Sequence, residues 1–309
     1  MERIKCALLG FGYWGKIIKK YIDADPRLEL RYILDRHINP LLKKEEILDV
    51  DAVFICLPSS LHYEFAKYFI QNGINVFCEK PLTLSYLETN ELITLAKKEE
   101  VVLYTDYPFL FSPSVNFIRE KVSSLGKINF IKFNFGQFGA FYCGEDVLDT
   151  IGPHPFSLLF HLFPSLANLE IHDSLVINRG ARGEILRCFV NFELGGVRGN
   201  LEMSLLSASK QRNFTIYCEN GYLSFSMSGD YTARIIKYPS EKTNDRLEKI
   251  ERSFRESDNL AASIEEFIVQ ISSPTDTNRN LTLAIATSIK TLRESFKRNT
   301  IAKRVRNEI

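Results

Sequence analysis

Three glycines near the start of the chain, Gly10, Gly12 and Gly15, have the spacing Gly-x-Gly-x-x-Gly. They follow a compact apolar run at residues 4–9 and precede apolar residues at helical spacing over residues 14–22. In such a strand–turn–helix, the first glycine permits a tight turn, the second lets the backbone approach a pyrophosphate, and the third lets the helix pack closely on the strand. The segment therefore predicts phosphate binding at a helix N-terminus, as in dinucleotide-binding proteins.

The predicted cofactor site contains the whole glycine loop and an acid further along the chain. Its loop residues are Gly10, Phe11, Gly12, Tyr13, Trp14 and Gly15. Asp35 ends a second predicted strand, where a carboxylate accepts hydrogen bonds from the adenosine ribose and would repel a 2′-phosphate. Asp35 therefore favours NAD, whereas the neighbouring Arg36 guanidinium could bind that phosphate and leaves NADP open.

Two further segments carry side chains suited to proton transfer. Lys80 lies in Glu79-Lys80-Pro81, a segment that follows a predicted strand, and the carboxyl ends of parallel strands face the crevice where ligands bind. Taken alone, this segment is more often an ordinary charged turn. His154 lies between two prolines that preset its backbone, although a lone histidine is more often structural. The five histidines have no metal-ligand spacing, so we expect no metal site.

The elements that must position these residues alternate in the first half of the chain. Apolar runs at residues 28–34, 52–57, 75–78 and 101–104 predict strands, and segments at residues 61–72 and 85–99 predict helices. This alternation is typical of an α/β fold, a parallel sheet with helices on both faces. Tyr107 follows the last of these strands and is a candidate substrate contact, with packing as the alternative.

The second half of the chain has a different pattern. Gly195-Gly196 and Asn220-Gly221 are hairpin signals between long alternating runs, which predicts an antiparallel sheet. The runs lie at residues 127–135, 171–178, 184–194, 197–206 and 213–218. One helix is expected at residues 114–125, before the sheet, and two more at residues 260–272 and 281–297.

Composition limits the class of protein. The 309 residues include 39 Lys and Arg against 38 Asp and Glu, so charge favours neither nucleic acid nor an anionic membrane as partner. No run approaches the roughly 18–20 apolar residues of a membrane span, and the first apolar block is too short for a secretory signal. The six cysteines do not have the Cys-x-x-Cys spacing of a metal site, which indicates free thiols in a reducing compartment. We expect a cytoplasmic protein with domains at residues 1–115 and 116–309.

Several short motifs occur along this chain in an order and spacing that are characteristic of one protein family. They are the glycine loop at residues 10–15, Leu57-Pro58-Ser59-Ser60-Leu61-His62, Glu79-Lys80-Pro81-Leu82, Phe111-Ser112-Pro113, Leu125-Gly126-Lys127-Ile128 and Gly152-Pro153-His154. Together they resemble the glucose–fructose oxidoreductase / inositol dehydrogenase family (Gfo/Idh/MocA), over nearly the whole chain. Within that family they most resemble members that act in bacterial sugar and polysaccharide pathways.

The resemblance implies a Rossmann domain followed by an α+β domain, whose large, mostly antiparallel open sheet often forms a dimer or tetramer interface. We therefore expect a homodimer or homotetramer. By position, Lys80 matches the family's catalytic lysine, which contacts nicotinamide ribose and substrate, and His154 matches its catalytic histidine. The positions lining the cofactor are matched by Leu57, Pro58, His62 and Glu79.

One position departs from the family pattern. The family often carries an acid four residues before the histidine, where this chain has Thr150, and its acid is Asp149, five residues before His154. Offsets of four and five differ by about 100° around a helix. Asp149 is therefore a candidate catalytic acid if the helix start shifts by one residue, and a solvated or helix-capping acid otherwise.

These observations predict an NAD(P)-dependent oxidoreductase that transfers a hydride between nicotinamide and a carbinol or keto carbon of a sugar or nucleotide sugar. His154 would accept the hydroxyl proton in oxidation, and Lys80 would orient the substrate and stabilise the alkoxide. Three alternatives stay open. They are a dinucleotide-binding ligand sensor without turnover, a net non-redox reaction such as glycoside cleavage through a transient keto sugar, and a reductase of a bilin or imine.

Overall fold

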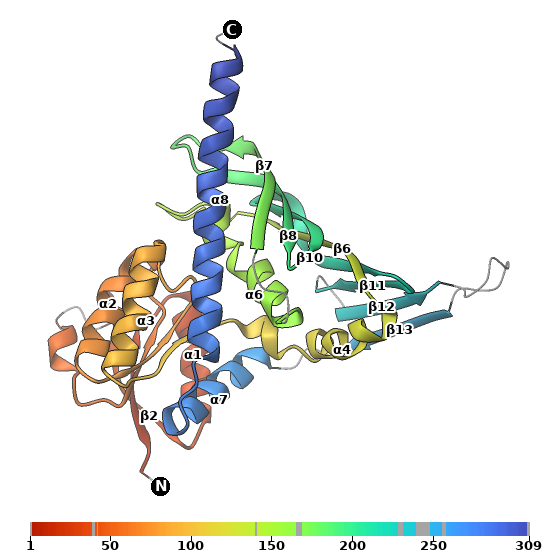
Figure 1. Ribbon diagram of the computed structural model, residues 1–309. Helices are drawn as coiled ribbons and strands as arrows, with labels where there is room; N and C mark the ends of the chain where they lie inside the picture. Colours follow the sequence, from red (N-terminus) through yellow and green to blue (C-terminus); the bar gives the residue numbers. More distant parts are fainter. Residues whose placement is uncertain are drawn as a thin grey trace. The chain divides into compact units, whose positions relative to one another are not determined.

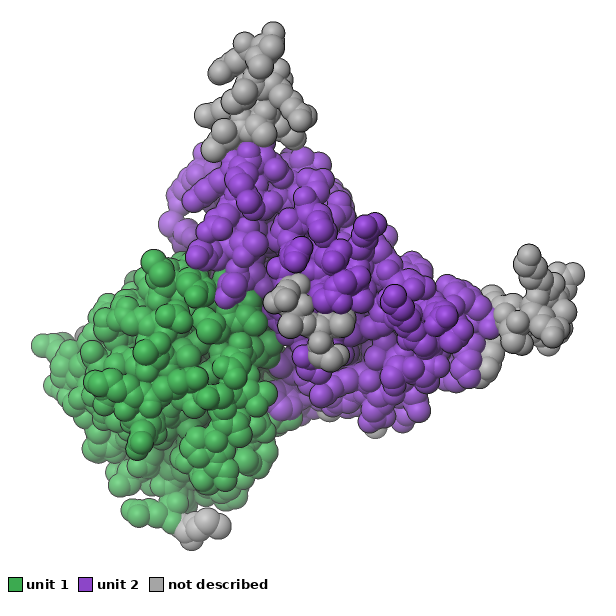
Figure 2. Space-filling view, in the orientation of Figure 1, with its two compact units in different colours: residues 1–108, 260–286 green, residues 109–259, 287–309 purple. Residues whose placement is uncertain are grey.

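The computed structural model describes residues 2–38, 41, 43–139, 141–164, 169–227, 231–238, 248–254 and 258–307. Contacts divide the chain into two compact units (Figure 2), unit 1 with residues 1–108 and 260–286, and unit 2 with residues 109–259 and 287–309. Unit 1 thus includes a segment from late in the chain. The domain division between residues 115 and 116 stays a prediction, because these units are defined by contacts and not by independent folding.

Unit 1 contains a five-stranded parallel sheet in the order β2-β1-β3-β4-β5. Figure 1 labels β2 and the helices of this unit. The strands are β1 (Ile4–Leu9), β2 (Leu28–Leu34), β3 (Ala52–Ile55), β4 (Asn75–Cys78) and β5 (Leu103–Thr105). This confirms the predicted parallel sheet. The strand order reverses beside β1, and ligands of such sheets bind outside the carboxyl ends of the strands at that switch point.

Helices cover both faces of this sheet. Helices α2 and α3 pack on one face, through side chains that include Phe69 and Leu92. Helices α1 and α7 pack on the other, through side chains that include Ile18 and Phe267. The bounds are α1 (Tyr13–Ala24), α2 (Ser59–Gln71), α3 (Tyr86–Lys98) and α7 (Asn259–Ser272). A short 3₁₀ segment, η1 (Lys44–Glu46), precedes β3.

Four aromatic rings form the core beneath α7. Phe77 of β4 lies 5.2 Å from Phe54, 5.6 Å from Tyr104 and 5.6 Å from Phe267, measured between ring centroids. These separations are favourable for aromatic pairs, and all four side chains are buried. The cluster explains why a helix from late in the chain completes the first unit.

Unit 2 is built on an eight-stranded sheet in the order β13-β12-β11-β10-β6-β9-β8-β7. All neighbouring strands pair antiparallel except β6 and β9, which are parallel, so the predicted, mostly antiparallel sheet is confirmed. The strands are β6 (Ile128–Phe138), β7 (Leu169–Arg179), β8 (Ile185–Leu194), β9 (Val197–Ser204), β10 (Leu206–Cys218), β11 (Gly221–Ser226), β12 (Tyr231–Lys237) and β13 (Glu248–Phe254).

The two faces of this sheet differ in polarity. Along β6, Ile131, Phe133 and Phe135 are buried, whereas Lys132 and Asn134 alternate with them and belong to the opposite face. The remaining helical segments of the described chain are η2 (Pro108–Phe111), α4 (Pro113–Lys121), η3 (Val122–Leu125), α5 (Val147–Thr150), α6 (Pro153–Leu162) and α8 (Thr277–Asn307). The last of these, α8, contributes residues to both units. Within the described part of the chain, every helix is too short or too polar to cross a membrane.

Several details differ from the sequence prediction. The strands β11, β12 and β13 lie outside the five predicted runs of the second half. The helix expected at residues 114–125 ends at Lys121 and continues as the 3₁₀ turn η3. The last helix begins at Thr277 and extends to Asn307, beyond the predicted residues 281–297. A short helix, α5, precedes α6, because Asp146 caps the backbone of a turn that has no hydrophobic periodicity of its own.

We predict that Phe77→Ala destabilises unit 1 by about 3–5 kcal/mol, because it empties the centre of the aromatic cluster. Urea unfolding would show a lower midpoint with little change in slope. The matched control is Leu87→Ala, which truncates an exposed side chain of α3. Equal midpoints for the two variants would contradict the assigned core.

Candidate cofactor and catalytic site

The glycine loop closes tightly between β1 and α1. Gly10 has φ +89°, a value that favours glycine, and a Cβ there would lie 2.7 Å from the carbonyl oxygen of Cys56. A Cβ on Gly15 would lie 2.1 Å from the carbonyl oxygen of Gly10. A Cβ on Gly12 would meet nothing within 4 Å. Folding therefore requires the first and third glycines, whereas the second leaves open space beside the backbone.

The first turn of α1 presents backbone N–H groups at this open space. Gly12 is the N-cap, no side chain caps the helix, and its first turn contains no acid. The positive end of the helix dipole is therefore not neutralised locally, which suits a pyrophosphate. Tyr13 and Trp14 are exposed in the same turn, with their rings in a T-shaped pair 5.4 Å apart.

Asp35 is held at the glycine loop, as its predicted role requires. One of its oxygens accepts a hydrogen bond from the Phe11 N–H at 2.9 Å, and the other accepts one from the His37 N–H at 2.8 Å. These backbone donors lower the pKa of the Asp35 carboxyl, so it is ionised at neutral pH. The neighbouring Arg36 is exposed and donates to the His37 ring at 3.0 Å.

His62 ties together two turns that contain predicted cofactor residues. The side chain is 1% exposed, with Nε2 2.8 Å from the carbonyl oxygen of Leu57 and Nδ1 2.8 Å from that of Pro81. The first turn includes Leu57 and Pro58, the N-cap of α2, and the second follows Lys80. His62 thus fixes the carboxyl ends of β3 and β4 against each other.

Glu79 and Lys80 follow β4 directly. Lys80 is half-buried, whereas Glu79 is 8% exposed and its Oε1 is buried with no hydrogen-bond partner in the structure. Burial is the main cause that raises the pKa of the Glu79 carboxyl, and the nearby Asp106 carboxyl adds to it, while Lys80 lowers it. Sequence reasoning missed Asp106, although this residue directly follows β5 as Glu79 directly follows β4.

Tyr107 lies deeper in unit 1 than a substrate contact would suggest. It is 3% exposed, and its hydroxyl donates to Thr282 Oγ1 at 3.3 Å. Burial raises the pKa of this phenol. These contacts are those of the packing alternative left open by the sequence, and the substrate role stays a prediction.

His154 occupies the first turn of α6 in unit 2. Its ring is half-buried and lies 4.8 Å from the ring of Phe109, measured between centroids. A Cβ on Gly152 would lie 2.3 Å from the carbonyl oxygen of Leu148, so α5 and α6 meet backbone to backbone just before the histidine. The position of His154 therefore depends on how α5 is held.

Two acids and an arginine hold α5. Asp146 caps the helix and accepts from the Leu148 N–H at 2.9 Å, and Asp149 accepts from the Asp146 N–H at 3.1 Å. Arg293 of α8 donates to Asp146 at 2.8 Å and to Asp149 at 2.7 Å. Burial and Asp146 raise the pKa of the Asp149 carboxyl, and Arg293 opposes them. The Thr150 hydroxyl donates to Glu145 at 3.4 Å.

These are the contacts of a helix-capping acid, the alternative that the sequence left open for Asp149. A catalytic role for Asp149 stays a prediction. Sequence reasoning missed Asp146 and Arg293. An acid directly before a short helical turn is a capping signal, but nothing local to residue 293 indicates its two partners.

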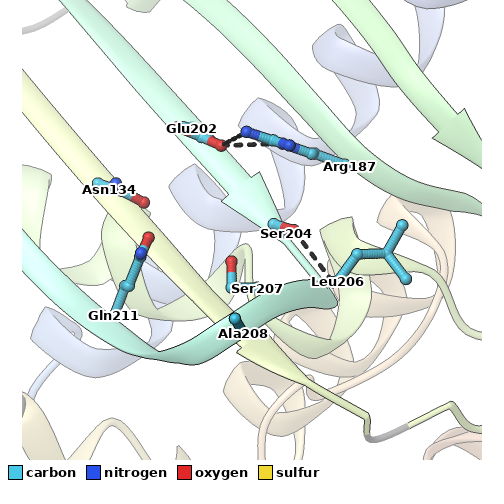
Figure 3. A pocket seen from close by; sticks show the side chains of 8 residues that line it. All are labelled: Asn134, Arg187, Glu202, Ser204, Leu206, Ser207, Ala208 and Gln211. Atoms are coloured by element: carbon cyan, nitrogen blue, oxygen red, sulfur yellow. Dashed lines mark hydrogen bonds and ion pairs between the residues drawn. The ribbon is translucent and has the colours of Figure 1, made fainter.

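A separate hollow lies on the eight-stranded sheet of unit 2 (Figure 3). It has a volume of about 260 Å³, and Arg187 of β8 and Glu202 of β9 form an ion pair at 2.6 Å along its wall. Its lining residues are Asn134, Arg187, Glu202, Ser204, Leu206, Ser207, Ala208 and Gln211. None of the predicted site residues lines it. Over the described residues, no three His, Cys, Asp or Glu side chains are grouped as a metal site would need.

Comparisons with known proteins agree with this geometry. Residues 4–107 match the model of the Gfo/Idh/MocA oxidoreductase family, described as an NAD-binding Rossmann fold. The uncharacterized oxidoreductase YgjR of Escherichia coli is 32% identical over 124 residues, which cover 40% of this chain and 35% of YgjR. The scyllo-inositol 2-dehydrogenase (NADP(+)) IolU of Bacillus subtilis is 33% identical over 92 residues, 30% of this chain and 28% of IolU. The matched part is thus well under half of each relative.

Solved structures resemble nearly the whole chain. KijD10, a 3-ketoreductase from Actinomadura kijaniata in complex with NADP, has a TM-score of 0.82 at 19% identity, covering 95% of this chain and 98% of that one. The UDP-N-acetylglucosamine 3-dehydrogenase GnnA from Acidithiobacillus ferrooxidans has a TM-score of 0.80 at 19% identity, covering 96% and 98%. At these identities the likeness establishes the fold.

Two alanine variants separate folding from cofactor binding. We expect Gly15→Ala to cost about 1–3 kcal/mol of stability, because its Cβ meets the Gly10 carbonyl oxygen. Gly12→Ala should keep stability within about 1 kcal/mol yet weaken NADH binding at least about tenfold, by filling the open space. Thermal unfolding and NADH fluorescence titration measure the two effects. Normal NADH affinity in Gly12→Ala would refute the assigned pyrophosphate position.

Arg293→Met should destabilise unit 2 by about 1–3 kcal/mol, since two buried carboxyls lose their shared cation. The loss of stability is smaller than for breaking a fully buried ion pair, because the Arg293 side chain is partly exposed to solvent. Adding Asp149→Asn to this variant should recover part of the loss. Urea unfolding measures both, with Arg198→Met, on an exposed side chain of β9, as control. No recovery in the double variant would contradict the charge explanation.

Proposed function

We propose that the chain is an NAD(P)-binding oxidoreductase of the Gfo/Idh/MocA family, since residues 4–107 match that family's Rossmann model. We further propose that it transfers a hydride between nicotinamide and a carbinol or keto carbon of a sugar or nucleotide sugar. The observation that carries the cofactor part is the open space at Gly12, beside the uncapped first turn of α1 and the ionised Asp35. These residues fit a dinucleotide. When bound, it supplies the hydride acceptor or donor.

Lys80 and His154 are the proposed catalytic residues. In oxidation, His154 accepts the proton of the substrate hydroxyl as the hydride leaves the same carbon, and Lys80 donates a hydrogen bond to the developing alkoxide. In reduction, His154 returns the proton to the new hydroxyl oxygen. The half-buried position of Lys80 at the end of β4 supports its role, and the packing of His154 on Phe109 in the first turn of α6 supports a fixed ring.

In this proposal Asp149 and Tyr107 position other groups and do not take part in proton transfer. The contacts of Asp149 with Arg293 and the α5 backbone support a role in positioning the turn that leads to His154. The buried hydroxyl of Tyr107, which donates to Thr282, supports a place beneath the site. Asp35 supports NAD over NADP. The homodimer or homotetramer implied by the resemblance stays a prediction, which sedimentation velocity would test.

Substrate class rests on names of similar proteins. The neighbours include a 3-ketoreductase solved with TDP-benzene and NADP and a UDP-N-acetylglucosamine 3-dehydrogenase. These names favour nucleotide sugars as the first substrates to test.

A ligand sensor that binds the dinucleotide without turnover is the second candidate. The observation in its favour is that Thr150 occupies the family's acid position while Asp149 is engaged by Arg293 and the α5 backbone. Titration with NADH and NADPH, followed by a panel of nucleotide sugars and keto sugars, distinguishes the two. NADH oxidation with one sugar supports the enzyme, and tight binding with no turnover on any sugar supports the sensor.

We predict that Lys80→Ala and His154→Asn each lower turnover by roughly 10²–10⁴-fold, because each removes a positioned acid–base group. NADH binding should persist in both, since the glycine loop and Asp35 are untouched. Steady-state assays with the sugar identified above and NADH fluorescence measure the two quantities. Lys98→Ala, on the exposed end of α3, is the matched control. Unchanged turnover in Lys80→Ala would contradict the proposed mechanism.

A further inference from the structure

Two buried carboxyls, those of Glu79 and Asp106, lie at the ends of neighbouring strands close to Lys80. Cys78 of β4 pairs with Thr105 of β5, so Glu79 and Asp106 each follow the last paired residue of adjacent parallel strands. The Asp106 N–H also donates to the carbonyl oxygen of Cys78 at 2.9 Å, which continues the register by one residue. The two acids are therefore neighbours across the sheet, and Lys80 is the next residue in the chain.

Both acids are withdrawn from water. Asp106 is 1% exposed, and its Oδ1 accepts a hydrogen bond from Ser263 Oγ of α7 at 2.6 Å. Glu79 keeps one buried oxygen, Oε1, without a partner. Burying two carboxylates side by side is costly unless a proton or a cation compensates them.

The surroundings leave Lys80 as the compensating cation. Burial is the main cause that raises the pKa of both carboxyls, Asp106 further raises that of Glu79, and Lys80 lowers both. The other titratable groups that face the pair are the thiols of Cys56 and Cys78 and the phenols of Tyr104 and Tyr107. Burial raises the pKa of each, so all four are neutral at neutral pH. The charge of Glu266, on α7, also raises the pKa of the Tyr104 phenol.

We propose that Glu79 and Asp106 act as one unit, a buried acid pair that shares a single proton at neutral pH and presents one negative charge to Lys80. Like charges this close do not both ionise readily in a buried site, so one proton stays with the pair. The remaining negative charge attracts the Lys80 ammonium and holds it near the carboxyl ends of β4 and β5. Asp106 is thus a positioning residue for Lys80, and it is the member that no motif in the sequence marks.

Sharing makes the two acids partly interchangeable. If Asp106 becomes neutral, Glu79 loses a like-charged neighbour and ionises more readily, so Lys80 keeps most of its counter-charge. If both become neutral, the half-buried ammonium has no carboxylate in this cluster. The effects of single and double substitutions on Lys80 should therefore be strongly non-additive.

The test measures Lys80 itself in the full chain. Competitive acetylation with acetic anhydride at a series of pH values, read by mass spectrometry of the Lys80 peptide, gives the midpoint of its deprotonation. The variants are Glu79→Gln, Asp106→Asn and the double substitution, all nearly isosteric. Asp51→Asn, on the exposed acid that precedes β3 and accepts from the Lys5 N–H, is the matched control.

The double variant should lower the Lys80 midpoint by at least about one pH unit, since an opposite charge nearby shifts a pKa by about 1–3 units. Each single variant should shift it by less than half as much, and Asp51→Asn not at all. An unchanged midpoint in the double variant would overturn the proposal. So would a single variant that produces the whole shift, because one acid alone would then serve Lys80.

A second measurement detects the shared proton through stability. Acids with raised pKa values bind protons more tightly in the folded than in the unfolded chain, so the free energy of unfolding falls as pH rises from about 4. Urea unfolding across pH should show this fall in the wild type and a flatter curve in the double variant. Identical curves would contradict a buried pair.

The catalytic role of the acid pair rests on the proposed function, but the acetylation experiment that tests the pair does not. Acetylation needs no substrate, so an absence of sugar turnover with a normal Lys80 shift would fail the proposed function alone. Once a substrate is known, the double variant should lower kcat while the KM for substrate and the affinity for NADH change little. A purely structural role of the pair would move none of the Lys80 readouts.

Discussion

The close approach of α1 to the turn after β1 is the contact on which the cofactor site depends. A side chain on Gly15 would place its Cβ 2.1 Å from the Gly10 carbonyl oxygen, so helix and turn meet backbone to backbone. This contact directs the first turn of α1 toward the carboxyl ends of the parallel strands. The same edge of the sheet carries Asp35 after β2, His62 near the start of α2, and Lys80 after β4, which explains why residues far apart in sequence serve one ligand.

Among the described residues, pairs of buried acids lie at two places, one in each unit. In unit 1 the pair is Glu79 and Asp106 beside Lys80, and in unit 2 it is Asp146 and Asp149 beside Arg293. Burial of a carboxylate is unfavourable without a cation or a proton, so such clusters need a reason beyond stability. Both lie next to a residue proposed for proton transfer, where a fixed position and a defined charge matter more than a small gain in folding energy.

The site was predictable where its signals are local. The glycine loop and the strand ends follow from periodicity and spacing within a few residues, and the cofactor half was visible from them. Arg293, which holds Asp149 from 144 residues away, has no local signal. Asp106 did have a local signal, since it follows a predicted strand more closely than Tyr107 does, but burial beside a second acid is a property of the folded sheet.

The sequence by itself determined the fold class, the dinucleotide loop and the order of the motifs, because hydrophobic periodicity and glycine geometry act over short stretches of chain. Tertiary structure decided that α7 completes the first core through Phe267, that Asp149 completes the cap of a short helix, and that Tyr107 is buried. These outcomes depend on which surfaces meet after the chain folds back on itself. Burial and long-range charge pairing arise only then, so no local pattern of residues could specify them.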